Sequence, residues 1–226
     1  MTARRRSSAA AAGPRLARPA ARSVAAKARP VRKPRAAAKA PKRRAKRQPL
    51  AIVRSPEHAT RQKAPRPIGC AIVTVSDTRR GFDDRSGTRA HELIERAGFE
   101  VVRRAWVRDD RGPIRRTVAG MLRLRAVDCV IVTGGTGMAK RDVTPEALAP
   151  LIQRELPGFG EMFRARSAEQ VGAAAWFSRA TAGVANGRLL VLLPGSTAAV
   201  ELALERLLLP ELAHAVRLLG RFKPGA

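Results

Sequence analysis

The sequence predicts an α/β domain built on a mostly parallel sheet and preceded by a long basic extension. From residue 68 onward, short apolar runs of strand length alternate with stretches of helical spacing. The net charge of +27 lies mostly before that residue: residues 1–67 contain 21 Lys and Arg and a single acid, Glu57, and residues 68–226 carry only +7. We therefore expect two parts, an extension over residues 1–67 and a folded domain over residues 68–226.

The extension consists mainly of Ala, Arg, Pro and Lys and has no aromatic residue. Such a composition cannot bury enough apolar surface to offset the entropy of ordering, so we expect disorder. A basic segment can bind nucleic acid in a salt-dependent way, and an Arg-rich segment poor in acids can also be a targeting peptide or an artefact of the start site. These alternatives stay open. Several of its prolines would interrupt any long helix, among them Pro14, Pro19, Pro30, Pro34, Pro41 and Pro49.

The first half of the domain reads as a βαβαβ unit, which implies parallel strands joined by right-handed crossovers. Its first strand is a nearly continuous apolar run, typical of a strand covered on both faces. The second strand is more polar and is expected near an edge. A helix that begins at Pro113 has apolar residues at helical spacing. The predicted elements are strands over 68–75, 99–107 and 127–133, a helix over 86–97, and the helix that follows Pro113.

The second half continues the alternation. Thr144 and Pro145 are typical of an N-cap and the first helical position, which predicts a helix to about residue 156 with a kink at Pro150. Further elements are a helix over 159–171, a buried strand over 188–193 and a helical segment over 197–219 that is interrupted at Pro210.

Two cysteines, Cys70 and Cys129, fall within predicted strands. We expect both to be buried apolar residues, because nothing in their spacing resembles a zinc site. No apolar run approaches the roughly 18 residues that a membrane-spanning helix needs. Cysteine usage and the lack of a secretory segment indicate a cytoplasmic protein without a membrane partner.

Three predicted strands end in residues suited to binding an anion. In an open parallel sheet, ligands bind beyond the carboxyl ends of the strands, where the strand order reverses. Glycines at the end of the third strand can form an anion nest, and hydroxyls of Ser76, Thr136 and Ser196 would add donors. The alternative is that the glycines only make tight turns; the spacing excludes a Walker A or dinucleotide motif. The loops are residues 74–78, 133–137 and 194–197.

Acidic residues accompany these loops. Asp142 follows the glycines, and a carboxylate beside phosphates is unfavourable unless a cation such as Mg²⁺ intervenes. Asp77 follows the first strand, and Asp109 follows the second and could reach the same rim. The bland interpretation of the remaining acids is that they are exposed loop residues: Asp83, Asp84 and Asp110.

Five ordered motifs of the domain belong together: Thr74-Val75-Ser76-Asp77, Asp84-Arg85-Ser86-Gly87, Thr133-Gly134-Gly135-Thr136-Gly137, Arg141-Asp142-Val143-Thr144-Pro145-Glu146 and Pro194-Gly195-Ser196. Together these motifs resemble the MoaB/MogA molybdopterin-binding family over about residues 68–222. The 178–183 stretch, Ser-Arg-Ala-Thr-Ala-Gly, is similar to the MoaB branch.

The resemblance implies a three-layer α/β/α sandwich that assembles into trimers or hexamers and binds molybdopterin and Mg-ATP. The implied reaction converts molybdopterin and ATP to adenylyl-molybdopterin and pyrophosphate, with Asp142 as the catalytic aspartate and Mg²⁺ ligand and Asp109 as a second catalytic aspartate. Two alternatives remain: a non-catalytic molybdopterin-binding or carrier protein on the same fold, and a nucleic-acid-associated protein. The resemblance also implies contacts with other cofactor-biosynthesis proteins. The implied binding residues are Ser76, Asp77, Gly134, Gly135, Thr136, Gly137, Thr144, Pro194, Gly195 and Ser196.

Overall fold

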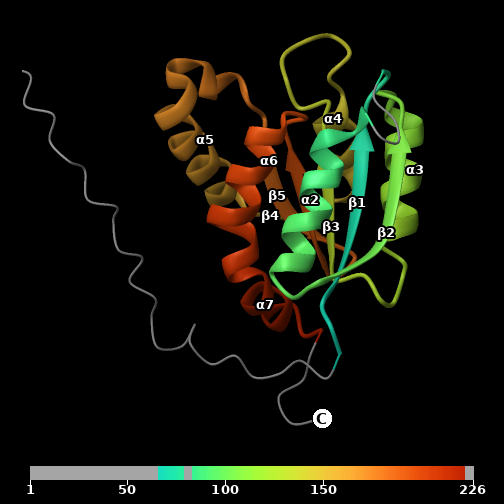
Figure 1. Ribbon diagram of the computed structural model, residues 1–226. Coiled ribbons are helices and arrows are strands. Elements are labelled where there is room, and N and C mark those ends of the chain that lie inside the picture. The colour runs from blue at the N-terminus through green and yellow to red at the C-terminus, as the bar shows by residue number, and fades with distance from the viewer. Residues whose placement is uncertain (1–65, 79–82, 222–226) are drawn as a thin grey trace, which may run out of the picture. The chain divides into compact units, whose positions relative to one another are not determined.

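A six-stranded sheet forms the centre of the structure, a computed structural model that describes residues 66–78 and 83–221. The strands lie in the order β2-β1-β3-β6-β5-β4 (Figure 1). The expected disorder of the extension falls outside the described residues, except for Arg66 and Pro67. The strands are β1 (Gly69–Val75), β2 (Glu100–Val107), β3 (Cys129–Thr133), β4 (Arg154–Glu155), β5 (Thr181–Ala185) and β6 (Arg188–Leu193).

Most of the sheet is parallel, as predicted. β1 pairs in parallel with both β2 and β3, and β3 pairs in parallel with β6. The more polar β2 forms one edge, as its composition indicated. At the other side, β5 runs antiparallel to both β6 and β4, and neither β4 nor β5 was predicted.

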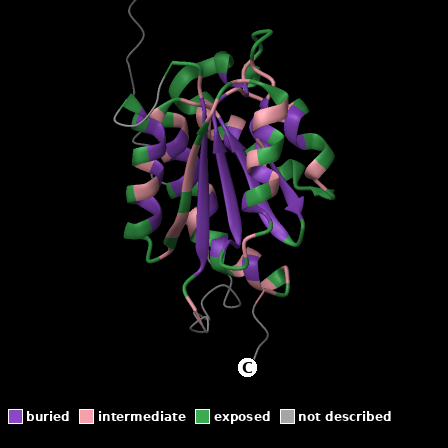
Figure 2. Ribbon diagram, turned by 90° about the vertical axis from the view of Figure 1, so that its right-hand side faces the viewer, coloured by how far each residue is buried: buried purple, intermediate pink, exposed green. Residues whose placement is uncertain are grey.

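Helices cover both faces of the sheet, which confirms the three-layer α/β/α fold (Figures 1 and 2). Strand side chains alternate between two apolar layers: Cys70 and Ile72 of β1 pack with one set of helices, and Ala71 and Val73 pack with the other. The first layer contains α2 (Arg85–Arg96), α5 (Pro157–Val171), α6 (Thr197–Ala203) and α7 (Leu209–Leu218), and the second contains α3 (Arg111–Met121) and α4 (Thr144–Leu148).

Two helix predictions need correction. The helix expected over 144–156 ends at Leu148, and a 3-10 turn over Ala149–Leu151 leads into β4. Pro150 has no N–H to continue the helix, and the next residues gain hydrogen bonds by pairing with β5 instead. The interruption expected at Pro210 is a π-helical turn over Leu204–Leu208 that joins α6 to α7 without separating them.

The two cysteines are buried, as predicted, and form no disulfide with each other. Cys70 and Cys129 lie side by side in the β1–β3 register. A hydrogen bond with the Cys70 side chain, together with burial, raises the pKa of the Cys129 thiol. Within residues 66–78 and 83–221, no helix combines the length and apolar character needed to cross a membrane.

A buried carboxylate fastens both ends of the described chain at the amino-terminal edge of the sheet. Asp128 has no exposed side-chain surface and precedes β3. Arg66 donates to its two oxygens at 2.8 and 2.7 Å, and Arg221 donates to it at 2.9 Å. The Gly69 N–H donates a fourth hydrogen bond at 3.0 Å. Arg66, which the sequence boundary placed in the extension, is therefore bound to the domain.

Candidate functional site

A cavity of about 540 Å³ opens at the carboxyl ends of β1, β3 and β6. It lies where the strand order reverses, because β1 has β2 on one side and β3 on the other. All three predicted loops therefore meet in one place. The predicted residues that line this cavity are Ser76, Asp77, Asp109, Gly134, Gly135, Thr136, Gly137, Asp142, Pro194, Gly195 and Ser196.

The glycine loop, residues 134–137, forms the floor between β3 and α4. Gly134 and Gly135 have φ angles of 105° and 64°. A Cβ atom at Gly134 would also stand 2.2 Å from the Val75 carbonyl oxygen, so no larger residue fits there. Among the described residues, no acceptor pairs with the backbone N–H groups of Gly135, Thr136 and Gly137. These donors are available to an anion, as the nest interpretation predicted.

Two threonines of this region have different roles. The Thr144 side chain is fully buried, donates to the Gly134 carbonyl at 2.9 Å and does not line the cavity. This geometry gives Thr144 the role of holding the glycine loop, and its expected role as a direct binding residue stays a prediction. The Thr136 hydroxyl is also buried, but it lines the cavity and has no hydrogen-bond partner within the described chain. A ligand hydrogen bond would satisfy it.

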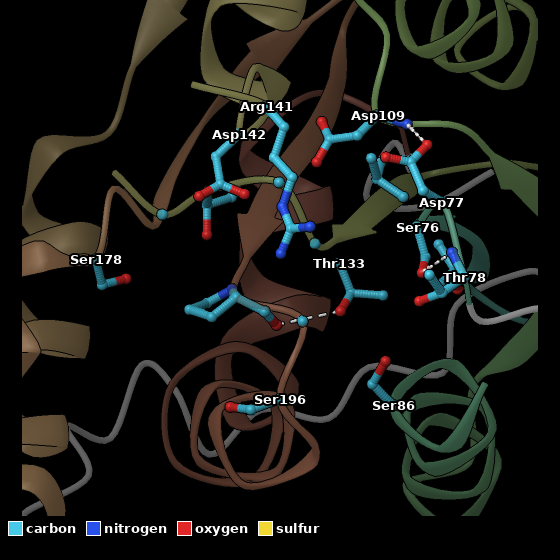
Figure 3. A pocket seen from close by; sticks show the side chains of 18 of the residues that line it. Ser76, Asp77, Thr78, Ser86, Asp109, Thr133, Arg141, Asp142, Ser178 and Ser196 are labelled. Atoms are coloured by element: carbon cyan, nitrogen blue, oxygen red, sulfur yellow. Dashed lines mark hydrogen bonds between the residues drawn. The ribbon is translucent and has the colours of Figure 1, made fainter. Parts of the chain in front are cut away.

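Three carboxylates give the cavity an excess of negative charge. Asp77, Asp109 and Asp142 line it, and Arg141 is the cationic side chain among its described lining residues. In Figure 3 the Arg141 side chain points into the cavity between Asp142 and Asp109. Burial, and after it repulsion from Asp142 and Asp77, raises the pKa of Asp109 despite a hydrogen bond from the Val143 N–H. A bound cation would relieve this repulsion.

The carboxylates fit a cation that is shared with a ligand. Within the described part of the chain, no group of three or more His, Cys, Asp or Glu side chains is arranged to hold a metal ion. Mg²⁺ is usually bound by one or two carboxylates together with water and substrate phosphates, so a complete protein cage is not required. Asp109 and Asp142 suit that arrangement.

A second cavity of about 570 Å³ adjoins the first and shares Asp77 and Asp109 with it. Arg108 and Arg111 also line it, next to the start of α3. Two cavities that meet at a pair of carboxylates can hold two ligands, or two parts of one ligand, on either side of a shared charge.

Asp84 was expected to be an exposed loop acid, and this is wrong. Its side chain is 1% exposed, whereas Asp83 and Asp110 are exposed as expected. A Cβ atom at Gly87 would lie 2.1 Å from the Asp84 carboxylate, so glycine at that position lets the acid fold under α2. Its donors are Thr74 (2.7 Å), the Gly87 N–H (2.8 Å), Trp106 (3.0 Å), Ser86 (3.2 Å) and Arg104 (3.3 Å).

Thr74 and Ser86 both line the main cavity, so Asp84 supports its wall from behind. The contacts with Ser86 and Gly87 are local, but those with Arg104 and Trp106 of the edge strand β2 leave no local signal in the sequence.

Comparison with known proteins gives a consistent family. The model of the family described as "Probable molybdopterin binding domain" matches residues 71–214. Molybdenum cofactor biosynthesis protein B of Bacillus subtilis is 45% identical over 158 residues, which cover 70% of this chain and 93% of the relative. The protein of the same name from Staphylococcus carnosus is 46% identical over 157 residues, which cover 68% and 92%.

Solved structures agree. A crystal structure of molybdenum cofactor biosynthesis protein B superimposes with a TM-score of 0.68 at 42% identity and covers 70% of this chain and 99% of that one. The tungsten cofactor synthesizing protein MoaB from Pyrococcus furiosus superimposes with a TM-score of 0.59 at 37% identity, covering 68% and 98%. The family model, the curated relatives and the solved structures agree, and the chain belongs to the MoaB/MogA family.

Proposed function

We propose that this protein acts in molybdenum cofactor biosynthesis by transferring adenylate from Mg-ATP to molybdopterin. The observation that carries the proposal is the union, in one cavity, of a glycine loop with unpaired N–H donors and of three carboxylates. The names of the relatives support the pathway, and the adjoining second cavity gives room for two substrates. Phosphate groups suit the donors, and a cation shared with them suits the acids.

The reaction needs no protein base. The terminal phosphate of molybdopterin is a monoester with a second pKa of about 6, so it is largely dianionic at neutral pH. One of its oxygens attacks the α-phosphorus of ATP, and the bond from that phosphorus to the bridging oxygen breaks. Pyrophosphate leaves with the bonding electron pair. The protein's contribution is to align the two phosphates and to stabilise their charge.

The chain's own groups divide this work. The glycine-loop N–H groups and the Thr136 hydroxyl would donate to phosphate oxygens, and Arg141 would offset their charge. Asp109 and Asp142 would hold Mg²⁺ against the same phosphates. When bound, Mg²⁺ supplies neutralisation of the charge on the transferring phosphate.

The substitution Asp142→Asn tests the proposal. It keeps the side-chain volume and removes the charge, so adenylyl transfer should fall by about 10²–10³-fold while the melting temperature stays within a few degrees of the wild type. Asp83→Asn, an exposed acid that does not line the cavity, is the matched control and should leave both unchanged. Purified protein is incubated with molybdopterin, Mg²⁺ and ATP, and adenylylated product is measured in a single turnover.

Three outcomes would contradict the assignment. Asp142 also accepts a hydrogen bond from the Ala139 N–H at 2.9 Å. If this local contact were its whole role, Asp142→Asn would lower stability and retain turnover. A wild-type protein that binds molybdopterin but forms no adenylylated product would be a binding or carrier protein. Binding of nucleic acid without binding of molybdopterin would reject the pathway itself.

We also propose that the protein assembles into a trimer or hexamer. Large apolar side chains are exposed on α5 and on the 3-10 segment that follows it: Met162 (56%), Trp176 (75%) and Phe177 (53%). Light scattering at micromolar concentration should give a mass above that of the monomer, and Trp176→Ser should reduce it. Leu218→Ser on α7, which is 73% exposed, is the control. A monomeric wild type would contradict the proposal.

A further inference from the structure

We propose that Arg179 is a positioning residue that fixes Asp142 by fastening the loop between Gly137 and Asp142. The inference rests on the proposed function, because it assigns Arg179 a role in adenylyl transfer through that carboxylate. Arg179 does not line the cavity and directly follows Ser178, which does.

The contacts of Arg179 converge on this one loop. Its Nε donates to the Gly137 carbonyl at 3.0 Å and its Nη2 donates to the Asp142 carbonyl at 2.6 Å. Its backbone N–H donates to the Thr136 carbonyl at 3.1 Å. One residue thus holds both ends of the 137–142 segment and the last residue before it.

The loop has little else to hold it. Residues 138–141 are exposed, with Met138 71% exposed. The described hydrogen bonds within the loop join only Asp142 and Ala139: the Asp142 N–H donates to the Ala139 carbonyl, and the Ala139 N–H donates to the Asp142 carboxylate, both at 2.9 Å. This turn fixes the two residues relative to each other. Beyond it, the N–H of the next residue, Val143, donates to Asp109 at 3.4 Å, and Arg179 adds hydrogen bonds at both ends of the loop.

Glu146 anchors the guanidinium from the other side. Arg179 Nη1 forms an ion pair with Glu146 in the first turn of α4. Burial acts to raise the pKa of Glu146, but its own backbone N–H and Arg179 outweigh that effect, and the net pKa is lowered. The same helix holds the start of the glycine loop through Thr144. Both the glycine loop and the 137–142 segment are therefore held by residues of α4.

The guanidinium geometry is specific to arginine. Three of its nitrogens donate to three separate acceptors, which are spread around the plane of the group. Lysine offers a single ammonium at the end of a flexible chain and cannot span all three. Arg179→Lys should therefore keep the charge and lose the geometry.

Proteolysis tests, without reference to activity, whether Arg179 and its hydrogen bonds to residues 136–142 (the clamp) hold the loop. Lys140 and Arg141 are exposed trypsin sites inside the loop. In Arg179→Lys and Arg179→Met, cleavage after these residues should accelerate at least about tenfold, as fragment masses would reveal in the full-length chain. Arg166→Met, which removes an exposed ion pair with Glu169 on α5, is the matched control and should leave the rate unchanged.

Kinetics test the route through Asp142. Loss of a residue that orients a functional carboxylate commonly costs about 10–100-fold in activity or metal affinity. Arg179→Lys should lower kcat by that factor, raise the Mg²⁺ concentration needed for half-maximal rate and leave molybdopterin affinity unchanged. In an Asp142→Asn background the same substitution should have no further effect on the rate, because its target is already removed.

Unchanged trypsin cleavage, a fully active Arg179→Lys protein, or additive losses in the double variant would each overturn the inference. If the wild type proves unable to adenylylate, the proteolysis result still decides whether the clamp exists. Should the Arg179 variants fail to fold, Glu146→Gln removes only the anchor and should show the same faster cleavage. If a folded Glu146→Gln protein is cleaved no faster than the wild type, this would count against the role of Arg179 in holding the loop.

Discussion

Starting the chain at Ile68 instead of Arg66 should measurably destabilise the domain. Arg66 makes two hydrogen bonds to the fully buried Asp128 carboxylate, and the shorter chain loses both. Each chain would carry the same initiator methionine, so the two proteins differ only in Arg66 and Pro67. The sequence analysis placed Arg66 in the extension that is expected to be disordered, and this comparison tests that boundary.

The size of the effect follows from what Asp128 keeps. Breaking a buried ion pair outright costs about 3–5 kcal/mol, because a buried charge is left without a partner. Here Arg221 and the Gly69 N–H remain on the carboxylate, and Arg66 is itself 37% exposed. Arg66 also repels the other cations near Asp128, which reduces its net contribution to stability. This repulsion is seen at Arg188, whose pKa is lowered first by burial, then by the charge of Arg221 and to a smaller extent by Arg66. We expect a loss of about 1–2 kcal/mol, near that of one charge-assisted hydrogen bond.

Thermal unfolding of the two chains measures this directly. In a domain of about 150 residues, each kcal/mol shifts the melting temperature by about 2–4 °C, so the chain that starts at Ile68 should melt about 2–8 °C lower. Arg66→Ala in the full-length chain should reproduce the difference. Equal melting temperatures for the two truncated chains would refute the reasoning, and turnover should remain the same in both because Asp128 lies at the far edge of the sheet from the cavity.

Three further predictions concern single positions. Gly134→Ala should lower the free energy of unfolding in urea by about 3 kcal/mol or more, and Gly98→Ala by only about 1–2 kcal/mol. Both glycines have a positive φ, but only at Gly134 would the new Cβ atom also lie 2.2 Å from a backbone oxygen. Equal losses would contradict this. Burial raises the pKa of Asp109, so its ionised carboxylate destabilises the native state at pH 7. Asp109→Asn should therefore raise the melting temperature at pH 7, and the gain should disappear below the ordinary Asp pKa of about 3.9, where the carboxyl is protonated in both states. A gain of the same size at both pH values would argue against this. Asp84→Ala should lower the free energy of unfolding by about 3–5 kcal/mol, because it removes a buried carboxylate with five donors. Asp83→Ala, at an exposed position, should change it by no more than about 0.5 kcal/mol. A small loss for Asp84→Ala would show that the five donors contribute little.

The parallel core was predictable because its strands have a clear signal. The apolar run that becomes β1 and the one that becomes β6 are buried along their whole length, and such runs are typical of covered parallel strands. β5 escaped prediction because Thr181–Ala185 contains mostly small residues with no marked alternation. The two residues of β4 are exposed and gain their conformation only from pairing with β5.

The site shows the same division. Residues whose role depends on backbone shape or position at a strand end, such as Gly134 and Ser76, could be recognised from the chain alone. Arg179 could not, because the acceptors of its side chain lie far away in the sequence; Gly137, for example, is 42 residues from it. Asp84 was recognisable only in part. Its hydrogen bonds with Ser86 and the Gly87 N–H are local, whereas Arg104 is 20 residues away.

The meeting of Arg66 and Arg221 on one carboxylate has a topological consequence. The points where the chain enters and leaves the folded domain are adjacent, since both side chains donate to the same oxygen of Asp128, Oδ1. Adjacent ends of this kind favour circular permutation and insertion into a loop of a host protein, because a short linker can close the gap without strain. The cavity lies at the opposite ends of the strands, so a copy of the domain inserted into a host protein through these two ends should keep its cavity accessible and away from the host.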